Sequence, residues 1–125
     1  MEYLNIRQTL LGNDNFRKVL ITGKHSQVVA MTVQPGDDIG EETHEVDQVL
    51  AFIDGTGKAV IGGEEAPIAT HDLFFVPAGT LHNFINTGTT AMRVLSIYAP
   101  AEHAPGTIHA TKADAVAAEA AEHAN

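Results

Sequence analysis

Two histidines, one carboxylate and one amide could hold a metal ion in this chain. Glu42, His44 and Gln48 lie close together, and His82 follows later in the sequence. The chain has no cysteine, so any ion must be held by nitrogen and oxygen ligands. Such a set suits a divalent transition metal. The two oxygen donors favour Fe or Mn, and Ni or Zn would also fit.

The spacing of these residues allows them to converge if they lie on strands. Alternate residues of a strand point to the same face, so Glu42 and His44 share a face. Gln48 keeps that parity unless a β-bulge intervenes. His82 follows the turn Pro77-Ala78-Gly79, which would fix the start of its strand. Neighbouring strands lie about 4.8 Å apart, so side chains from two paired strands can meet on one ion.

Short apolar runs broken by turn residues fill the middle of the chain and predict an all-β fold. Asp54-Gly55 and Gly62-Gly63 are hairpin signals, because these residues tolerate positive φ. Several short strands at regular spacing favour an antiparallel sandwich or barrel. The predicted strands are residues 16–22, 26–34, 48–53, 58–61, 73–76, 82–85 and 92–98.

The two ends of the chain differ from this middle part. Residues 4–12 are loosely helical or irregular in pattern, and residues 111–124 predict an alanine-rich helix. Thr111 followed by Asp114 resembles a capping box at the start of that helix. The tail between barrel and helix carries His103 and His109. These could approach a pocket if the tail packs over the barrel, but we interpret them as residues outside it.

The motifs resemble those of the cupin superfamily. Its first motif is a glycine, five residues, His-x-His, three or four residues, Glu, six residues and a glycine, and the frame from Gly36 to Gly55 has this spacing. Its second motif is a glycine, five residues, Pro-x-Gly, two residues, His, three residues and Asn. The segment from Pro77 to Asn86 matches it, with His71 at the place of the leading glycine.

Two of the four expected ligands differ from the cupin pattern. Glu42 stands for the first histidine and Gln48 for the glutamate, whereas His44 and His82 match directly. The resemblance implies a metal site formed by Glu42, His44, Gln48 and His82. Two imidazoles and one carboxylate are also the ligand set of non-heme iron(II) enzymes. The alternative is a pocket without metal, held by Glu–His hydrogen bonds.

The resemblance also implies an architecture. We expect one domain over residues 1–125, with a jelly-roll (double-stranded β-helix) barrel at about 16–99 and a tail and short helix at 100–125. Cupins commonly pair through their sheets, so a homodimer is expected. Small single-domain cupins are often labelled as similar to mannose-6-phosphate isomerase. A phosphate would need basic residues, however, and Arg93 is the only arginine in the second half of the barrel.

Two functions follow from this site. The first is a metal-dependent isomerase, lyase or oxygenase acting on a small oxygen-rich, sugar-like or keto-acid-like substrate. Glu42 could then act as a general base, if burial raises its pKa and it is not a tight ligand. The alternative is a non-catalytic cupin that binds a small ligand or a metal. Strand alternation predicts a pocket wall of Met31, Phe52, Phe84 and Tyr98, with Val33, Leu50 and Phe75 as further inward-facing candidates.

Composition excludes several partners. The formal net charge is −9, with only seven lysines and arginines, so nucleic acid and anionic membrane surfaces are not expected as partners. No apolar run approaches the roughly 18 residues of a membrane span, and no signal peptide is apparent. We therefore expect a cytoplasmic protein. The only serines, Ser26 and Ser96, lie outside any nucleophile-elbow motif, which argues against a serine hydrolase.

Overall fold

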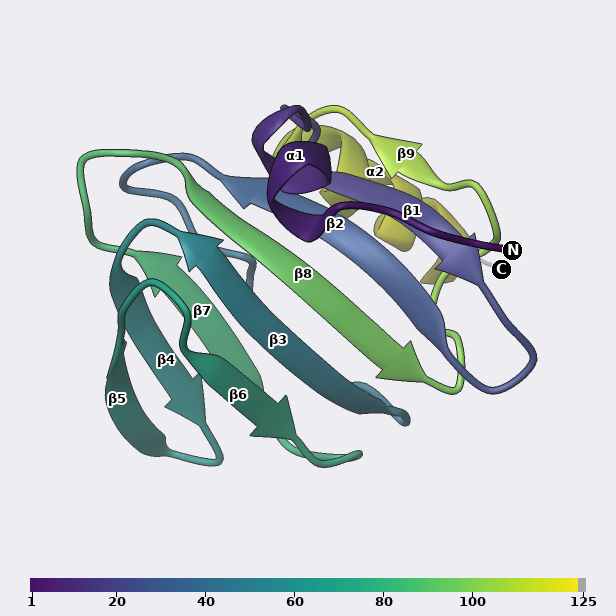
Figure 1. The fold of residues 1–125 in the computed structure, drawn as a ribbon. Helices are drawn as coiled ribbons and strands as arrows, with labels where there is room; N and C mark the ends of the chain where they lie inside the picture. The colour runs from purple at the N-terminus through teal and green to yellow at the C-terminus, as the bar shows by residue number, and fades with distance from the viewer. Residues whose placement is uncertain (124–125) are drawn as a thin grey trace.

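The computed structural model describes residues 1–123, and the side chains of residues 1–121. Within this part of the chain, antiparallel strands form two sheets that face each other (Figure 1). The smaller sheet has the order β5 (Glu64–Ile68), β4 (Gly57–Ile61), β7 (His82–Asn86). The larger sheet has the order β6 (Leu73–Val76), β3 (Asp47–Asp54), β8 (Met92–Ala99), β2 (Gln27–Val33), β1 (Arg17–Thr22), β9 (Ile108–His109). The predicted all-β jelly-roll barrel is confirmed.

The sequence pattern did not predict two of the strands, β5 and β9. β5 contains two adjacent glutamates and Pro67, which lacks a backbone donor and therefore does not indicate a strand. Proline is tolerated there because β5 is the edge of the smaller sheet. β9 is only two residues long and pairs with β1, which attaches the C-terminal tail to the larger sheet.

The core fills the space between the sheets. Along β3 the inward-facing side chains alternate with outward-facing ones, and Gln48, Leu50 and Phe52 are buried as predicted. The rings of Phe52 and Phe84, from opposite sheets, lie 5.5 Å apart at their centroids. The prediction for Phe75 is wrong. It points outward and is 51% exposed, and its neighbour Phe74 packs against Phe52 instead.

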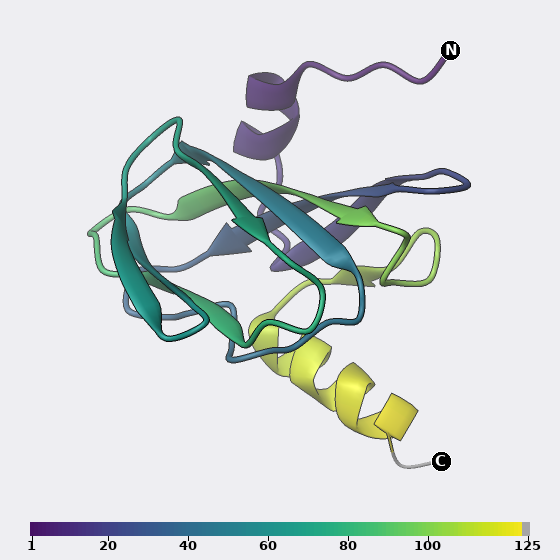
Figure 2. The ribbon, with the colours of Figure 1, turned by 90° about the horizontal axis from the view of Figure 1, so that it is seen from below.

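Two helices lie on opposite sides of the barrel (Figure 2). α1 (Ile6–Leu11) is capped by the Asn5 side chain and buries Leu10 against the outer face of the larger sheet. α2 (Lys112–His123) begins where the Thr111 hydroxyl accepts a hydrogen bond from the Asp114 backbone, as the predicted cap requires. Among the described residues, no helix is both long and apolar enough to cross a membrane.

Positive φ angles explain why the cupin motifs have glycine at the positions of Gly55 and His71. Gly55 has φ +91°, and a Cβ there would lie 2.7 Å from the Met92 Cα, so both its conformation and its packing require glycine. His71 stands where the cupin motif has a glycine, and its φ is 75°. Histidine is among the side chains that occupy this left-handed region more often than most. His71 is therefore an exposed turn residue.

Candidate metal centre

Backbone pairing brings the two motifs together. The segment carrying Glu42 runs antiparallel beside β7, and Glu42 and His82 exchange two backbone hydrogen bonds of 3.0 Å each. Side chains of directly opposed residues point to the same side of the sheet. The turn before β7 holds the next residue of the set, because the Gly79 amide donates a 2.7 Å hydrogen bond to the His44 carbonyl.

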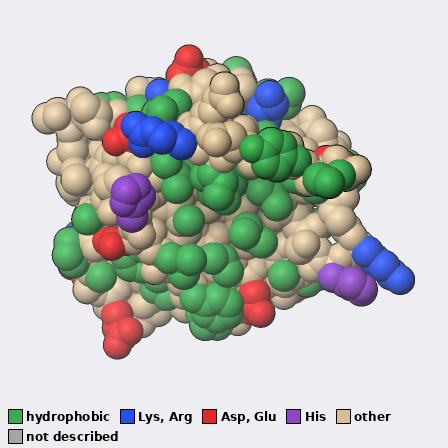
Figure 3. All heavy atoms as spheres, viewed as in Figure 1, with side chains coloured by type: hydrophobic (Ala, Val, Ile, Leu, Met, Phe, Trp, Pro, Cys, Tyr) green, Lys and Arg blue, Asp and Glu red, His purple; other side chains and the backbone are tan. Residues whose placement is uncertain are grey.

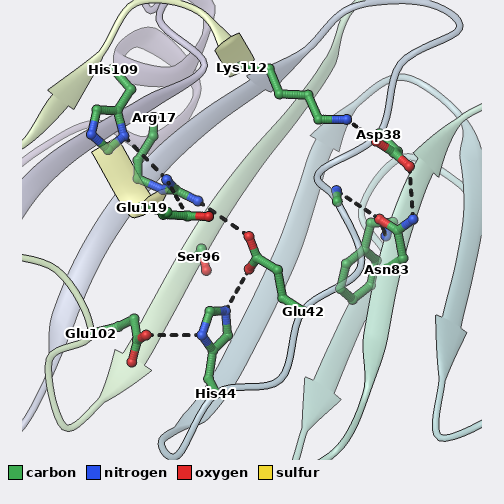
Figure 4. Close-up of polar contacts among 12 residues, drawn as sticks. Arg17, Asp38, Glu42, His44, Asn83, Ser96, Glu102, His109, Lys112 and Glu119 are labelled. Carbon is green, nitrogen blue, oxygen red and sulfur yellow. Dashed lines mark hydrogen bonds and ion pairs between the residues drawn. The ribbon is translucent and has the colours of Figure 1, made fainter. Parts of the chain in front are cut away.

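Three predicted ligands converge as a result. Glu42, His44 and His82 each offer a ligand atom, and these atoms all lie within 4.8 Å of one another. The two imidazole rings are 5.3 Å apart at their centroids. The His44 Nε2 lies 2.7 Å from a Glu42 oxygen, and the two side chains form an ion pair when the imidazole is protonated (Figure 4). The three side chains form a compact, mostly buried donor cluster.

Both imidazoles are oriented through their other nitrogen. The Nδ1 of His82 lies 2.9 Å from the Thr80 carbonyl, and the Nδ1 of His44 lies 3.0 Å from a Glu102 carboxylate oxygen. The Thr80 carbonyl favours the His82 tautomer protonated at Nδ1, which leaves a lone pair on Nε2, and Glu102 favours the same tautomer of His44 when that ring is neutral. The His82 Nε2 is buried and has no hydrogen-bond partner among the described residues, whereas the His44 Nε2 faces the Glu42 carboxylate. A hydrogen-bonded second nitrogen of this kind is typical of metal-ligating histidines.

The Gln48 amide is oriented in a similar way. Its Nε2 donates to the Ser96 Oγ at 2.9 Å and to the Tyr98 hydroxyl at 3.1 Å. Its Oε1 is buried and accepts no hydrogen bond from the described residues. A buried carbonyl oxygen without a partner costs free energy, and a metal ion would satisfy it. The Tyr98 ring lies 5.6 Å from the His44 ring, so this amide belongs to the same region.

The chemistry of the donor set therefore fits a divalent ion. Two imidazole nitrogens and a carboxylate face one another, the Gln48 amide lies in the same region, and the His82 Nε2 and the Gln48 Oε1 are buried without partners among the described residues. Sites with such nitrogen and oxygen donors suit Fe, Mn, Ni or Zn, and the general order of metal affinities alone does not choose among these ions.

The two histidines differ in basicity. Burial lowers the pKa of His44, but hydrogen bonds to Glu102 and Glu42 and their negative charges outweigh it and raise the pKa to about 9. In the metal-free protein, His44 thus carries a proton between two carboxylates. The pKa of His82 is lowered, chiefly by burial and further by the charge of His44.

Arg17 is the residue that the sequence analysis missed. It begins β1, is 1% exposed, and places its Nη2 3.8 Å from a Glu42 oxygen (Figure 4). Its Nη1 lies 3.2 Å from the Nδ1 of His109 and 3.4 Å from a carboxylate oxygen of Glu119. Arg93, which the sequence analysis singled out, lies elsewhere. It donates to the backbone carbonyls of residues 10 and 13.

The C-terminal tail packs over the site, contrary to our interpretation of its histidines. The buried Gln27 accepts hydrogen bonds from the backbone of Glu102 and His103 and donates one to the His103 carbonyl. The His103 ring stands edge-on to Tyr98 at 5.2 Å. Burial, with a smaller effect of nearby Arg17, lowers the pKa of His103 to about 4.

The predicted pocket wall is buried throughout. Met31, Phe52, Phe84 and Tyr98 are all at most 1% exposed. Tyr98 and Phe84 lie nearest the histidines, with the Phe84 ring 6.1 Å from that of His82. Contact between these four residues and a substrate stays a prediction. Asn86, the last residue of the second motif, has a structural role: its side-chain amide donates hydrogen bonds to the backbone carbonyls of Val33 and Thr90.

A small β-barrel with two imidazoles and a carboxylate clustered in its interior defines the class of this protein. A profile of the cupin domain matches residues 29–98, more than half of the chain, and the chain therefore belongs to the cupin family. It is 46% identical over 123 residues to the uncharacterized protein YrkC of Bacillus subtilis (strain 168). That match covers 93% of this chain and 66% of YrkC, so the chain spans about two thirds of that relative.

Solved structures agree with this assignment. The crystal structure of BH2720 from Bacillus halodurans has a TM-score of 0.91 and 39% sequence identity, and the match covers 93% of each chain. A protein described as a predicted oxalate decarboxylase from Thermotoga maritima has a TM-score of 0.57 and 25% identity, with 60% of this chain and 66% of that chain covered.

Proposed function

We propose that this cupin binds one divalent transition-metal ion through Glu42, His44, Gln48 and His82. We further propose that it is a metal-dependent isomerase, lyase or oxygenase for a small oxygen-rich substrate, sugar-like or keto-acid-like. One observation carries the proposal: both histidines have their Nδ1 engaged by an acceptor, and each turns its Nε2 inward, the His44 Nε2 to the Glu42 carboxylate and the His82 Nε2 to a buried position without a hydrogen-bond partner among the described residues. Fe or Mn is the preferred ion, because two of the four donors are oxygens.

The chain's own residues have defined tasks in this proposal. A bound ion would supply Lewis acidity toward substrate oxygens. Glu102 and the Thr80 carbonyl fix the two imidazole rings, and Ser96 and Tyr98 fix the Gln48 amide. The apolar core around Phe84 excludes water from one side, which strengthens electrostatic interactions inside.

Glu42 is the residue whose role the experiment must separate. We assign it as a ligand, because a carboxylate oxygen of Glu42 and a ring nitrogen of each of His44 and His82 all lie within 4.8 Å of one another. The test is the metal content of untagged protein, for wild type, His82→Ala and Glu42→Gln. We expect about one ion per chain in wild type and loss of the ion in both variants. If Glu42→Gln keeps its metal and loses turnover, Glu42 is a base and not a ligand. A wild type that holds no ion, even after refolding with Fe, Mn, Ni and Zn, refutes the proposal.

We also propose that the protein forms a homodimer through the outer face of the larger sheet. Side chains paired across β6, β3 and β8 make two apolar rows there, and Figure 3 shows hydrophobic side chains gathered over these strands. Large exposed apolar patches mark interaction sites. The rows consist of Phe75, Val49 and Ile97, and of Leu73, Ala51 and Leu95. Phe75 and Leu73 are the exposed members, whereas Leu95 is buried beside Leu10 of α1.

Light scattering after size-exclusion chromatography tests the dimer. Phe75→Lys should yield monomers, because it buries a charge in the interface. Leu81→Lys is a matched control, since Leu81 is also 51% exposed but lies in the turn before β7. A monomeric wild type, or a Phe75→Lys variant that remains dimeric, contradicts the proposed interface.

A further inference from the structure

We propose that Arg17 is a recognition site for the carboxylate of the substrate, and that the Glu119 side chain occupies this site until an anionic substrate displaces it. The inference rests on the proposed function and narrows it. Among oxygen-rich substrates, it selects small 2-hydroxy or 2-oxo carboxylic acids, whose paired oxygens can reach an ion while their negative charge faces a guanidinium.

The first observation is that Arg17 is buried but incompletely paired. Burying a guanidinium is costly unless its N–H groups are satisfied. The Nη2 contact to Glu42 is 3.8 Å, and the Nη1 contacts to Glu119 and to the His109 Nδ1 are 3.4 Å and 3.2 Å. All three are longer than the roughly 2.7–2.9 Å of a strong charge-assisted hydrogen bond. The Arg17 Nε is buried and has no hydrogen-bond partner among the described side chains. The guanidinium therefore retains capacity for a further planar acceptor.

The second observation is the position of Arg17 beside the candidate metal centre. Its Nη2 is close to an oxygen of Glu42, one of the proposed ligands, so a substrate held next to Glu42 would meet the guanidinium (Figure 4). Arginine binds carboxylates in a two-pronged geometry that neutral hydroxyl groups cannot match. A substrate carboxylate can thus contact the ion and Arg17 together.

Glu119 is suited to be displaced. It is 40% exposed, whereas Arg17 is 1% exposed, so the carboxylate covers the guanidinium from the solvent side. Of residues 112–121 in α2, only Ala115 is buried, and Lys112 anchors the first turn by pairing with Asp37 and Asp38. A rotation of the Glu119 side chain toward solvent can therefore release the guanidinium while Lys112 and Ala115 hold the helix in place.

The charges around the site favour a carboxylate over a phosphate. Two cations contact Glu42, Arg17 and the protonated His44, and in the proposed site His44 gives up its extra proton when it binds the ion. Lys112 is committed to Asp37 and Asp38, and Arg93 is held by backbone carbonyls and Asp14 on the α1 side. A phosphate dianion would call for further cations, whereas a monoanion that replaces Glu119 leaves the charge of the site unchanged.

Isothermal titration calorimetry on Mn(II)-loaded protein tests this inference with two probes, glycolate and its neutral analogue glycolamide. The readout is the ratio of their affinities. We expect Arg17→Gln to lower the preference for glycolate at least tenfold while changing glycolamide affinity less than twofold. Glu119→Gln should strengthen glycolate binding at least threefold, because the internal competitor is gone. Asp114→Asn, an exposed carboxylate on the same helix, is the control and should leave the ratio unchanged.

The outcomes separate the two proposals. Protein that fails to load Mn(II) or any other ion refutes the metal site, whatever Arg17 does. Protein that loads Mn(II) but shows the same preference in wild type and Arg17→Gln refutes only the carboxylate site. If Arg17→Gln does not fold, Glu119→Gln decides: glycolate binding that is unchanged, or raised equally by Asp114→Asn, overturns the inference.

Discussion

Metal loading should release about one proton per chain near neutral pH, and His44 should be its source. The pKa of His44 in the metal-free protein is raised to about 9, since its bonds to Glu102 and Glu42 outweigh its burial. At pH 7 the ring is then about 99% protonated. A protonated imidazole has no lone pair for a metal, so the proton competes with the ion. Affinity should rise about tenfold per pH unit up to about pH 9, a total of about 100-fold from pH 7.

Calorimetric titration of Mn(II) in two buffers of different ionisation enthalpy, at pH values between 6.5 and 8.5, counts the released protons. His82 should contribute less than His44, because burial lowers its pKa from the usual value. Glu102→Gln removes a partner that raises the pKa of His44, so the variant should release fewer protons at pH 7.5. Glu65→Gln removes an exposed carboxylate paired with Lys58 and serves as the control. Binding that is independent of pH and of buffer would refute the reasoning.

Three further predictions concern stability. In metal-free protein the pKa of His44 is raised from 6.5 to about 9, so the protonated ring stabilises the folded state fully below pH 6.5, and this stabilisation is lost as the pH rises to about 9. Thermal melts in the presence of a chelator should show a melting temperature that falls over this range, and a flat profile contradicts the prediction. His71→Gly should raise the free energy of unfolding by about 0.5–1 kcal/mol in urea titrations, because it relieves a positive φ. Gly55→Ala should cost at least about 2 kcal/mol more than Gly40→Ala, since both have positive φ but only Gly55 meets the Met92 backbone; equal costs would contradict the steric argument.

The motif spacing predicted the centre of the site because it reflects backbone pairing. Glu42 and His82 face each other through two backbone hydrogen bonds, and the Gly79 turn holds His44, so these contacts follow from the order of strands and turns. The alternation of β3 likewise predicted that Gln48 and Phe52 are buried.

Contacts from distant segments could not be predicted. Arg17 meets His109, 92 residues later, and Glu119, 102 residues later, and no local pattern encodes such pairing. The prediction that Phe75 faces the core was wrong for another reason. β6 is four residues long and wholly apolar, so its alternation could be assigned in either phase, and only its register with β3 fixes which phenylalanine faces the core.

The position of the ion tests the central claim most directly. Crystals of the protein soaked with Mn(II) and measured near the manganese absorption edge would show the ion as an anomalous difference peak. We predict one strong peak within bonding distance of the Glu42 carboxylate, the Nε2 atoms of His44 and His82, and the Gln48 Oε1. A peak elsewhere, or none at this cluster while the side chains keep their places, would contradict the assignment of these four residues as a metal site.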